Sequence, residues 1–300
     1  MKSIESNSLK NYTKRLMKYS QYLLIGSLWV TFLSCETSVD ASDLLEKEQF
    51  VVINGYLSPQ DTTLKVQISK SKSRAESTIT NNADLVISNA TVTITDENDN
   101  QVTLIYSSTS FSYEIPATDL AILPGRKYFL AVTAEGKDYK SSCVIPSELV
   151  ENIESEITNN NDVDSFGNKK LKLKIDDIAD KRNFYIVGAK VTQAFNSGED
   201  SVTDVDFEFE QFTTDSNREN AVVTVDGIFN EFFDSQSSKA NVQVANAEEI
   251  LYDALRATFL NDYNEDDPFF EPVIAPTNIE GESGFGVFAG YQLTEKEITF

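Results

Sequence analysis

The stretch from residue 90 to residue 106, ATVTITDENDNQVTLIY, decides the fold class of this chain. Val92 and Ile94 alternate with threonines, which places both apolar side chains on one face of a strand. Residues 96–100, DENDN, are turn formers, and residues 101–106 return to an alternating pattern. A strand, a short polar turn and a second strand predict an antiparallel hairpin.

The same pattern of short alternating runs and turns extends over residues 49–148. Further strands are expected at residues 50–57, 64–69, 111–116, 128–134 and 139–146. No helical period of 10–15 residues separates these runs, which disfavours a parallel α/β sheet. The spacing predicts an N-terminal immunoglobulin-like antiparallel sandwich.

The rest of the chain predicts a second β domain with one helix. Residues 149–165 are rich in Asn, Asp and Glu, and we expect a linker or exposed loop there. Within residues 166–300, strands are expected at 171–175, 184–191, 205–212 and 221–225, with closing strands at 285–300. A helix is expected near 247–262, with Asn246 as its N-cap and an apolar stripe that includes Leu251 and Leu255. The expected fold class is therefore mainly β.

Charge and composition exclude several functions. After residue 34 the chain carries 47 acidic against 20 basic side chains, a net charge of −27. A field of that sign repels phosphate backbones, so nucleic acid is excluded as a partner. The sequence contains no histidine, which removes the Ser-His-Asp triad and the usual zinc ligands. We expect no catalytic residues, no cofactor, no metal and no enzymatic activity.

The N-terminus is typical of a secretory signal, assigned to residues 1–34. A basic segment precedes the apolar run 22–33, which is too short as a helix to span a bilayer. Residues 32–35, FLSC, are similar to the lipobox of bacterial lipoproteins, with Phe32 and Leu33 departing from its commonest form. Lipidation (palmitate) of Cys35 is therefore expected, with residues 35–48 as an acidic tether. The alternative is a disulfide to Cys143, whose alternating context instead predicts a buried thiol.

Two sets of side chains are candidates for a partner surface. Residues 204–210, DVDFEFE, predict a strand with four carboxylates on one face: Asp204, Asp206, Glu208 and Glu210. That face is either a surface for cations or a basic partner, or the solvated face of an edge strand. Phe269 and Phe270 belong to a group of C-terminal aromatics that is either exposed for a partner or buried in the second domain.

Two other patterns have simpler readings than ligand binding. Residues 96–100 offer oxygen ligands for calcium, but Ser107 occupies the place of the bidentate Glu of a calcium loop, so a hairpin turn is preferred. Gly281, Gly284, Gly286 and Gly290 fit no nucleotide-binding motif and predict tight turns or close strand approach.

Five segments together resemble a known family. They are FVVINGYLSP (50–59), SNATVTITDENDNQ (88–101), LPGRKYFLAV (123–132), YKSSCVIP (139–146) and DPFFEPVIAPTNIEGESGFGVFAGY (267–291). The chain resembles a domain-of-unknown-function family of Bacteroidota outer-membrane lipoproteins encoded beside TonB-dependent receptors. The family tends to have Asn at the position of Asp267, a change that leaves a turn possible there.

The resemblance implies localisation at the outer membrane, on either its periplasmic or its surface face, and a TonB-dependent receptor as partner. The expected function is a membrane-anchored, non-catalytic binding or accessory component of TonB-dependent nutrient uptake. Two alternatives remain: a carboxylate-dependent glycan hydrolase, which needs two carboxyl groups facing a cleft, and a structural surface adhesin.

Overall fold

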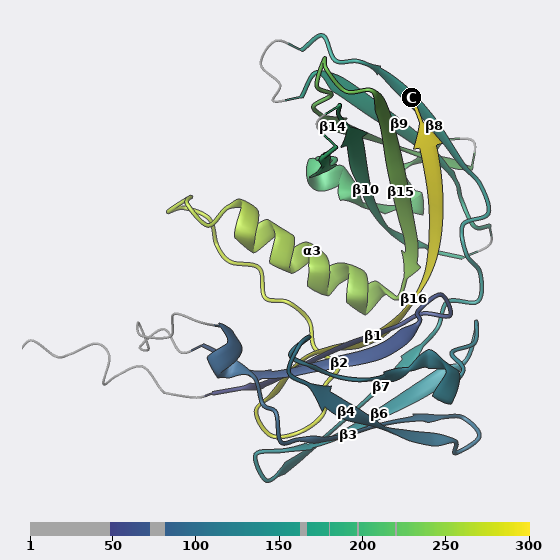
Figure 1. Ribbon diagram of the computed structural model, residues 1–300. Helices are drawn as coiled ribbons and strands as arrows, with labels where there is room; N and C mark the ends of the chain where they lie inside the picture. Colours follow the sequence, from purple (N-terminus) through teal and green to yellow (C-terminus); the bar gives the residue numbers. More distant parts are fainter. Residues whose placement is uncertain (1–48, 73–81, 163–166, 180, 197, 220) are drawn as a thin grey trace, which may run out of the picture. The chain divides into compact units, whose positions relative to one another are not determined.

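A computed structural model of the chain describes residues 49–72, 82–162, 167–179, 181–196, 198–219 and 221–300 (Figure 1). The signal segment, Cys35 and the tether 35–48 lie outside the described residues. Within the described ranges the chain is mainly β with a single α-helix, which confirms the predicted fold class.

Seven strands form the N-terminal sandwich, close to their predicted positions. They are β1 (Val51–Leu57), β2 (Thr63–Lys70), β3 (Thr91–Asp96), β4 (Gln101–Ser107), β5 (Ser112–Pro116), β6 (Lys127–Ala134) and β7 (Lys137–Val144). Alternate residues of each strand point into one core, as Leu64, Val66 and Ile68 do in β2. Strand β4 pairs with both β5 and β3 and so joins the two halves of the sandwich.

The second β region contains nine further strands and the helix. They are β8 (Ile153–Asn159), β9 (Lys169–Asp176), β10 (Phe184–Ala194), β11 (Asp200–Asp204), β12 (Phe212–Thr214), β13 (Arg218–Glu219), β14 (Val222–Phe229), β15 (Ser237–Ala247), β16 (Gly284–Thr299) and α3 (Glu249–Tyr263). Short 3-10 turns occur at η2 (Asn82–Leu85), η3 (Ala117–Asp119), η4 (Glu208–Gln211) and η5 (Asp215–Asn217). Strands β8, β9, β14 and β13 make a separate four-stranded sheet.

The last strand joins the two β regions into one sheet. The first part of β16 pairs in parallel with β1, and its second part pairs antiparallel with β15. Residues 285–300 are therefore one long strand and not the several closing strands that were expected. Phe288 of β16 lies in the core of the N-terminal sandwich, whereas Ile298 packs against the second core.

Three further local predictions are wrong. Strand β8 lies inside residues 149–165, which were expected to be a linker or loop, and it pairs with β9. Residues 205–212 are not one strand, because Asp206 Oδ1 accepts a hydrogen bond from the Glu208 N–H (2.8 Å) and Glu208 adopts a φ of 48°. That Asx turn leads into η4 and ends the strand.

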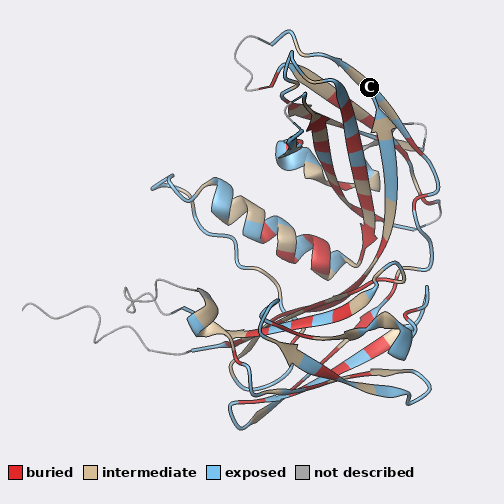
Figure 2. Cartoon of the chain, viewed as in Figure 1, coloured by how far each residue is buried: buried red, intermediate tan, exposed pale blue. Residues whose placement is uncertain are grey.

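The third correction concerns the start of the helix. Asn246 is not the N-cap, because β15 extends to Ala247 and Glu248 occupies the capping position. The apolar stripe is confirmed, since Leu251 and Ala254 pack on Val287 and Ala289 of β16. Figure 2 shows the buried residues of α3 gathered along one side of the helix. The helix therefore lies on the sheet face opposite the sandwich core.

Candidate functional site

A polar hollow lies on the same sheet face as α3, over strands β16, β1, β2 and the start of β5. We call it the β1–β2 hollow. Its volume is about 410 Å³. It is lined by Asn54, Tyr56, Asp61, Thr63, Lys65, Gln67, Ser110, Ser112 and Tyr291.

Strand alternation places these side chains. In β1, Val51, Ile53 and Leu57 point into the sandwich core, so Asn54 and Tyr56 must point to the opposite face. Tyr56 and Tyr291 also pack against the cluster of apolar residues beneath α3. The pairing of β1 with β16 brings Tyr291 beside residues that precede it by more than 200 positions.

The turn between β1 and β2 fixes the carboxyl group of the hollow. Asp61 Oδ2 accepts a hydrogen bond from the Ser58 N–H (2.9 Å), and Asp61 Oδ1 accepts one from the Tyr291 hydroxyl (2.8 Å). Gln60 Oε1 in the same turn accepts hydrogen bonds from Ser58 Oγ (2.6 Å) and from the Leu293 N–H (3.1 Å). The turn is thus attached to β16 as well as to its own strands.

Burial changes the acidity of both partners in this pair. Burial raises the pKa of Asp61, while its hydrogen bond from Tyr291 lowers it in part. Burial, followed by the nearby Asp61 charge, raises the pKa of Tyr291 well above its usual range. Tyr291 therefore keeps its proton at neutral pH and serves as a hydrogen-bond donor.

A second hollow brings together three of the four predicted carboxylates. Asp206, Glu208 and Glu210 line it together with Asp226 and Lys170, among others, and its volume is about 580 Å³. Lys170, Asp226 and Glu210 already have partners within the hollow. Lys170 Nζ lies 2.7 Å from Asp226 Oδ2, and Glu210 Oε2 accepts a hydrogen bond from the Asp226 N–H (2.6 Å).

Asp204 is separate from that hollow and pairs with Lys190 across strands β11 and β10 (3.7 Å). Among the described residues, no cluster of three or more acidic or thiol side chains has a geometry suited to a metal ion. The four predicted carboxylates thus divide between an ion pair on the sheet and a hollow that contains its own cation.

The candidate calcium run 96–100 is the preferred hairpin turn between β3 and β4. Asp96 Oδ1 accepts hydrogen bonds from the Asn98 and Asn100 N–H groups (2.8 and 2.9 Å). The hydrogen bond from the Asn100 side chain is the largest cause that lowers the pKa of Asp96. The carboxylate thus stabilises the turn itself.

Phe269 lies on the loop between α3 and β16, and its side chain is 94 % exposed. Ile274 on the same loop is 90 % exposed. Asn261 of α3 holds this loop by two hydrogen bonds, from the Val273 N–H (2.8 Å) and to the Val273 oxygen (2.9 Å). The Phe269 N–H donates to Asp267 Oδ1 (2.9 Å), so Asp267 does form a turn. The loop presents two apolar side chains on an attached backbone.

The C-terminal aromatics do not form one buried cluster. Phe288 is fully buried, but in the sandwich core and not in the second domain. Tyr263 and Phe269 are exposed, and Phe270 is half-buried. The preferred interpretation, burial in the second domain, is therefore wrong for these residues. Phe288 lies in the sandwich core because the first part of β16 pairs with β1.

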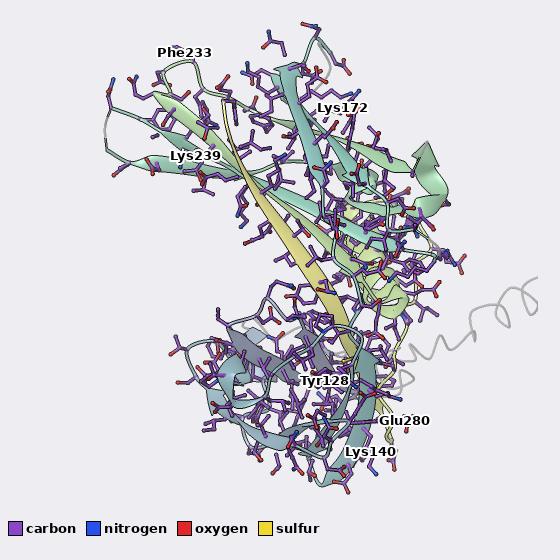
Figure 3. All side chains as sticks on the ribbon, turned by 90° about the vertical axis from the view of Figure 1, so that its right-hand side faces the viewer. Tyr128, Lys140, Lys172, Phe233, Lys239 and Glu280 are labelled. Carbon is purple, nitrogen blue, oxygen red and sulfur yellow. The ribbon has the colours of Figure 1, made fainter. Side chains whose placement is uncertain are left out.

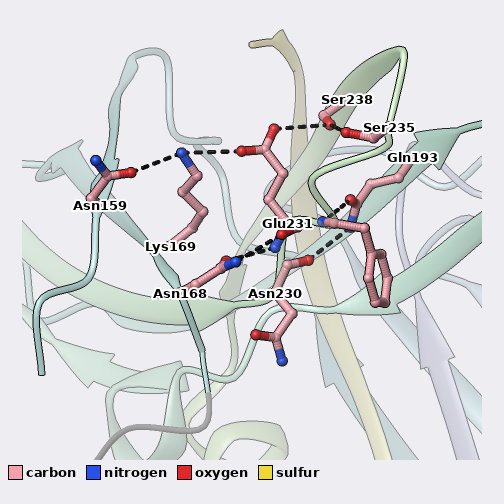
Figure 4. A network of polar contacts seen from close by, with 9 residues as sticks. Asn159, Asn168, Lys169, Gln193, Asn230, Glu231, Ser235 and Ser238 are labelled. Atoms are coloured by element: carbon pink, nitrogen blue, oxygen red, sulfur yellow. Dashed lines mark hydrogen bonds and ion pairs between the residues drawn. The ribbon is translucent and has the colours of Figure 1, made fainter. Parts of the chain in front are cut away.

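A second loop, residues 230–236, connects β14 to β15. A network of polar contacts holds it in place (Figure 4). Glu231 Oε2 lies 3.0 Å from Lys169 Nζ, and Gln193 bonds to the Asn230 oxygen (2.7 Å) and the Phe232 N–H (2.8 Å). Phe233 of this loop is fully exposed (Figure 3).

The segment 278–288, which includes the start of β16, is attached to the edge of β7. Lys140 and Glu280 exchange backbone hydrogen bonds (2.9 and 2.8 Å) and lie side by side in Figure 3. Asn278 Oδ1 accepts from the Phe288 N–H (2.9 Å), and its Nδ2 donates to the oxygens of Phe288 (2.7 Å) and Ser142 (3.3 Å). This segment covers a sheet edge that would otherwise expose unpaired backbone groups.

Asn278→Asp is expected to lower the free energy of unfolding by about 2–4 kcal/mol, because a carboxylate would face two carbonyl oxygens in place of a donor. Chemical denaturation measures the change. Asn241→Asp, at an exposed position of β15, is the matched control and is expected to change stability by no more than about 0.5 kcal/mol. Equal losses in the two variants would show that the amide contacts of Asn278 contribute nothing special.

The fold and its site define a mainly β protein in which one long strand serves two cores beside a ligand-sized polar hollow. A family model described as a domain of unknown function (DUF4249) matches residues 36–297 of the chain. The chain belongs to this family. No curated protein matches it. None of the helices in the described part of the chain has the length and hydrophobicity that a bilayer crossing needs.

Sequence reasoning missed the β1–β2 hollow. Nothing in the sequence pattern placed Asp61 beside Tyr291. A signal was present in β1, where Asn54 and Tyr56 share the face opposite the core residues. That signal could not identify Tyr291 as a neighbour, because the parallel pairing of β1 and β16 leaves no local trace in the sequence.

Proposed function

We propose that this protein is an exported lipoprotein, anchored through Cys35, that acts as a non-catalytic accessory component of a TonB-dependent uptake system at the outer membrane. The lipobox-like residues 32–35 support the anchor, and the resemblance to Bacteroidota lipoproteins supports the partner. One observation of the fold supports docking. The α3–β16 loop holds Phe269 and Ile274 in water, although burying each would be favourable.

The attachment of this loop makes it suited to docking. Two hydrogen bonds to Asn261 hold its backbone at Val273, which reduces the conformational entropy lost on binding. A lipid anchor also restricts the protein to the membrane plane, which raises its effective concentration near a receptor.

The hydrolase alternative has less support from the geometry. A glycosidase of the usual kind needs two carboxyl groups on either side of its substrate. Among the described residues that line the β1–β2 hollow, Asp61 supplies the one carboxyl group. The second hollow has more carboxyl groups, but Asp226 pairs with Lys170, Glu210 accepts from the Asp226 N–H, and Asp206 accepts from the Glu208 N–H.

The double variant Phe269→Ser/Ile274→Ser is expected to abolish co-purification with the TonB-dependent receptor from gently solubilised membranes. Burying these two side chains is worth about 3–6 kcal/mol together, or more than a hundredfold in affinity. Thermal unfolding is expected to change little, since both side chains are exposed.

Phe233→Ser is the matched control, because it removes an equally exposed phenylalanine from a different loop. It is expected to leave the receptor bound. Loss of the receptor with Phe233→Ser and its retention in the double variant would reject the α3–β16 loop as the docking surface. Recovery of no receptor with the unchanged protein, and no growth defect on any nutrient after gene deletion, would reject the uptake role.

A further inference from the structure

The β1–β2 hollow has the composition of a ligand site, and the function proposed above does not use it. We propose that this hollow binds a neutral, polyhydroxylated ligand, namely a sugar unit of a glycan. The hollow shares no residue with the α3–β16 loop, so ligand binding there does not depend on docking to a receptor.

Side chains without partners point to a ligand that both donates and accepts hydrogen bonds. No hydrogen bond from the side chains of Tyr56, Thr63 or Gln67 to another described residue is present, and Asn54 uses only its oxygen, toward the Val287 N–H (3.2 Å). Amides and hydroxyls donate and accept at once, as sugar hydroxyls do. These groups therefore match a ring that carries several hydroxyls in a small volume.

Two tyrosines supply the apolar part of the site. Tyr56 and Tyr291 come from strands β1 and β16 and line the hollow together. An aromatic ring offers a flat apolar surface beside a polar hydroxyl, which suits a ligand with C–H groups on one side and hydroxyls around its edge. The volume of about 410 Å³ lies within the range of about 300–1,000 Å³ that is usual for small-molecule sites.

The charges in the hollow favour a neutral ligand. Its lining holds one carboxyl group, that of Asp61, and one ammonium group, that of Lys65. Lys65 Nζ also lies 3.9 Å from Glu114 Oε2. A phosphate or sulfate ligand would need several cations, and the net charge of −27 after residue 34 repels anions in general.

The position of the hollow also disfavours a peptide. An extended peptide gains most of its affinity by pairing with an exposed sheet edge. Strand β1 is paired on both sides, with β16 and β2, and β2 is paired with β1 and β5. The hollow thus offers a sheet face made of side chains, and no free backbone edge.

The Asp61–Tyr291 pair prepares the site before a ligand arrives. The hydrogen bonds from Ser58 and Tyr291 fix both oxygens of Asp61, and each oxygen retains a lone pair for a ligand hydroxyl. Gln60 of the same turn accepts a hydrogen bond from the Leu293 N–H, which attaches the pair to β16 as well.

The test is a glycan array that carries neutral and acidic oligosaccharides, probed with the full protein in mild detergent. Titration calorimetry with the strongest neutral oligosaccharide follows. Gln67→Ala is expected to weaken binding at least tenfold. Tyr291→Phe is expected to weaken it further, because Asp61 loses the hydrogen bond from the Tyr291 hydroxyl.

Gln101→Ala is the matched control, since Gln101 is an exposed strand glutamine outside the hollow. It is expected to leave the affinity unchanged, and thermal unfolding of every variant confirms that the fold persists. Binding to no neutral oligosaccharide, binding confined to acidic ones, or equal affinities of Gln67→Ala and Gln101→Ala would overturn the proposal. Loss of glycan binding in Gln67→Ala with the receptor still bound would separate this site from the docking loop.

Discussion

Gly286→Ala is expected to lower the free energy of unfolding by about 3 kcal/mol or more. Gly286 lies in β16 beside β1 with a φ of 110°, a conformation that side chains rarely adopt. A Cβ at this position would overlap the carbonyl oxygen of Ile53, which is backbone and cannot rotate away. Urea denaturation of the two proteins measures the difference.

Gly188→Ala provides the matched control for this substitution. Gly188 also lies in a strand of the large sheet, β10, but a Cβ there would meet no atom within 4 Å. Its replacement is expected to be neutral or slightly stabilising, because alanine reduces the entropy of the unfolded chain. A loss as large as that of Gly286→Ala would show that the effect at Gly286 does not come from the overlap with Ile53.

Cys35→Ser is expected to move the protein out of the membrane fraction entirely. If Cys35 carries the acyl chains, the variant loses the whole hydrophobic anchor, at about 0.8 kcal/mol for each buried CH₂ group. The change also removes the thiol that lipidation requires, so the acylated N-terminal peptide is expected to disappear. Detergent extraction and mass spectrometry of the N-terminal peptide measure both effects.

Cys143→Ala is the control, because Cys143 is the other cysteine and is free and buried in the sandwich. It is expected to leave the protein in the membrane fraction. Equal membrane fractions of Cys35→Ser and the unchanged protein, once the signal has been removed from both, would refute the lipoprotein assignment.

The strands of the sandwich could be predicted because each one buries every second side chain. The run 90–106 gave β3, its turn and β4 nearly at their observed bounds. The prediction for 205–212 failed although its alternation was just as regular. One hydrogen bond from the Glu208 N–H to Asp206 was enough to turn the chain, and periodicity does not register a competing local hydrogen bond.

The candidate sites were predicted less well than the strands. Phe269 is exposed, as a partner surface requires, whereas the four carboxylates from Asp204 to Glu210 do not share one face. The hollow that we propose as a ligand site contains none of the residues singled out from the sequence as a partner surface.

The sequence by itself determined the mainly β class, the strands of the sandwich, the single helix of the described residues and the strong acidity of the chain. Each of these follows from neighbouring residues or from composition. Only the tertiary structure decided that β16 pairs with β1, that Phe288 belongs to the first core and that Tyr291 meets Asp61. Those contacts join residues more than 200 positions apart, and they depend on which strand edges meet after folding, which no local pattern of side chains specifies.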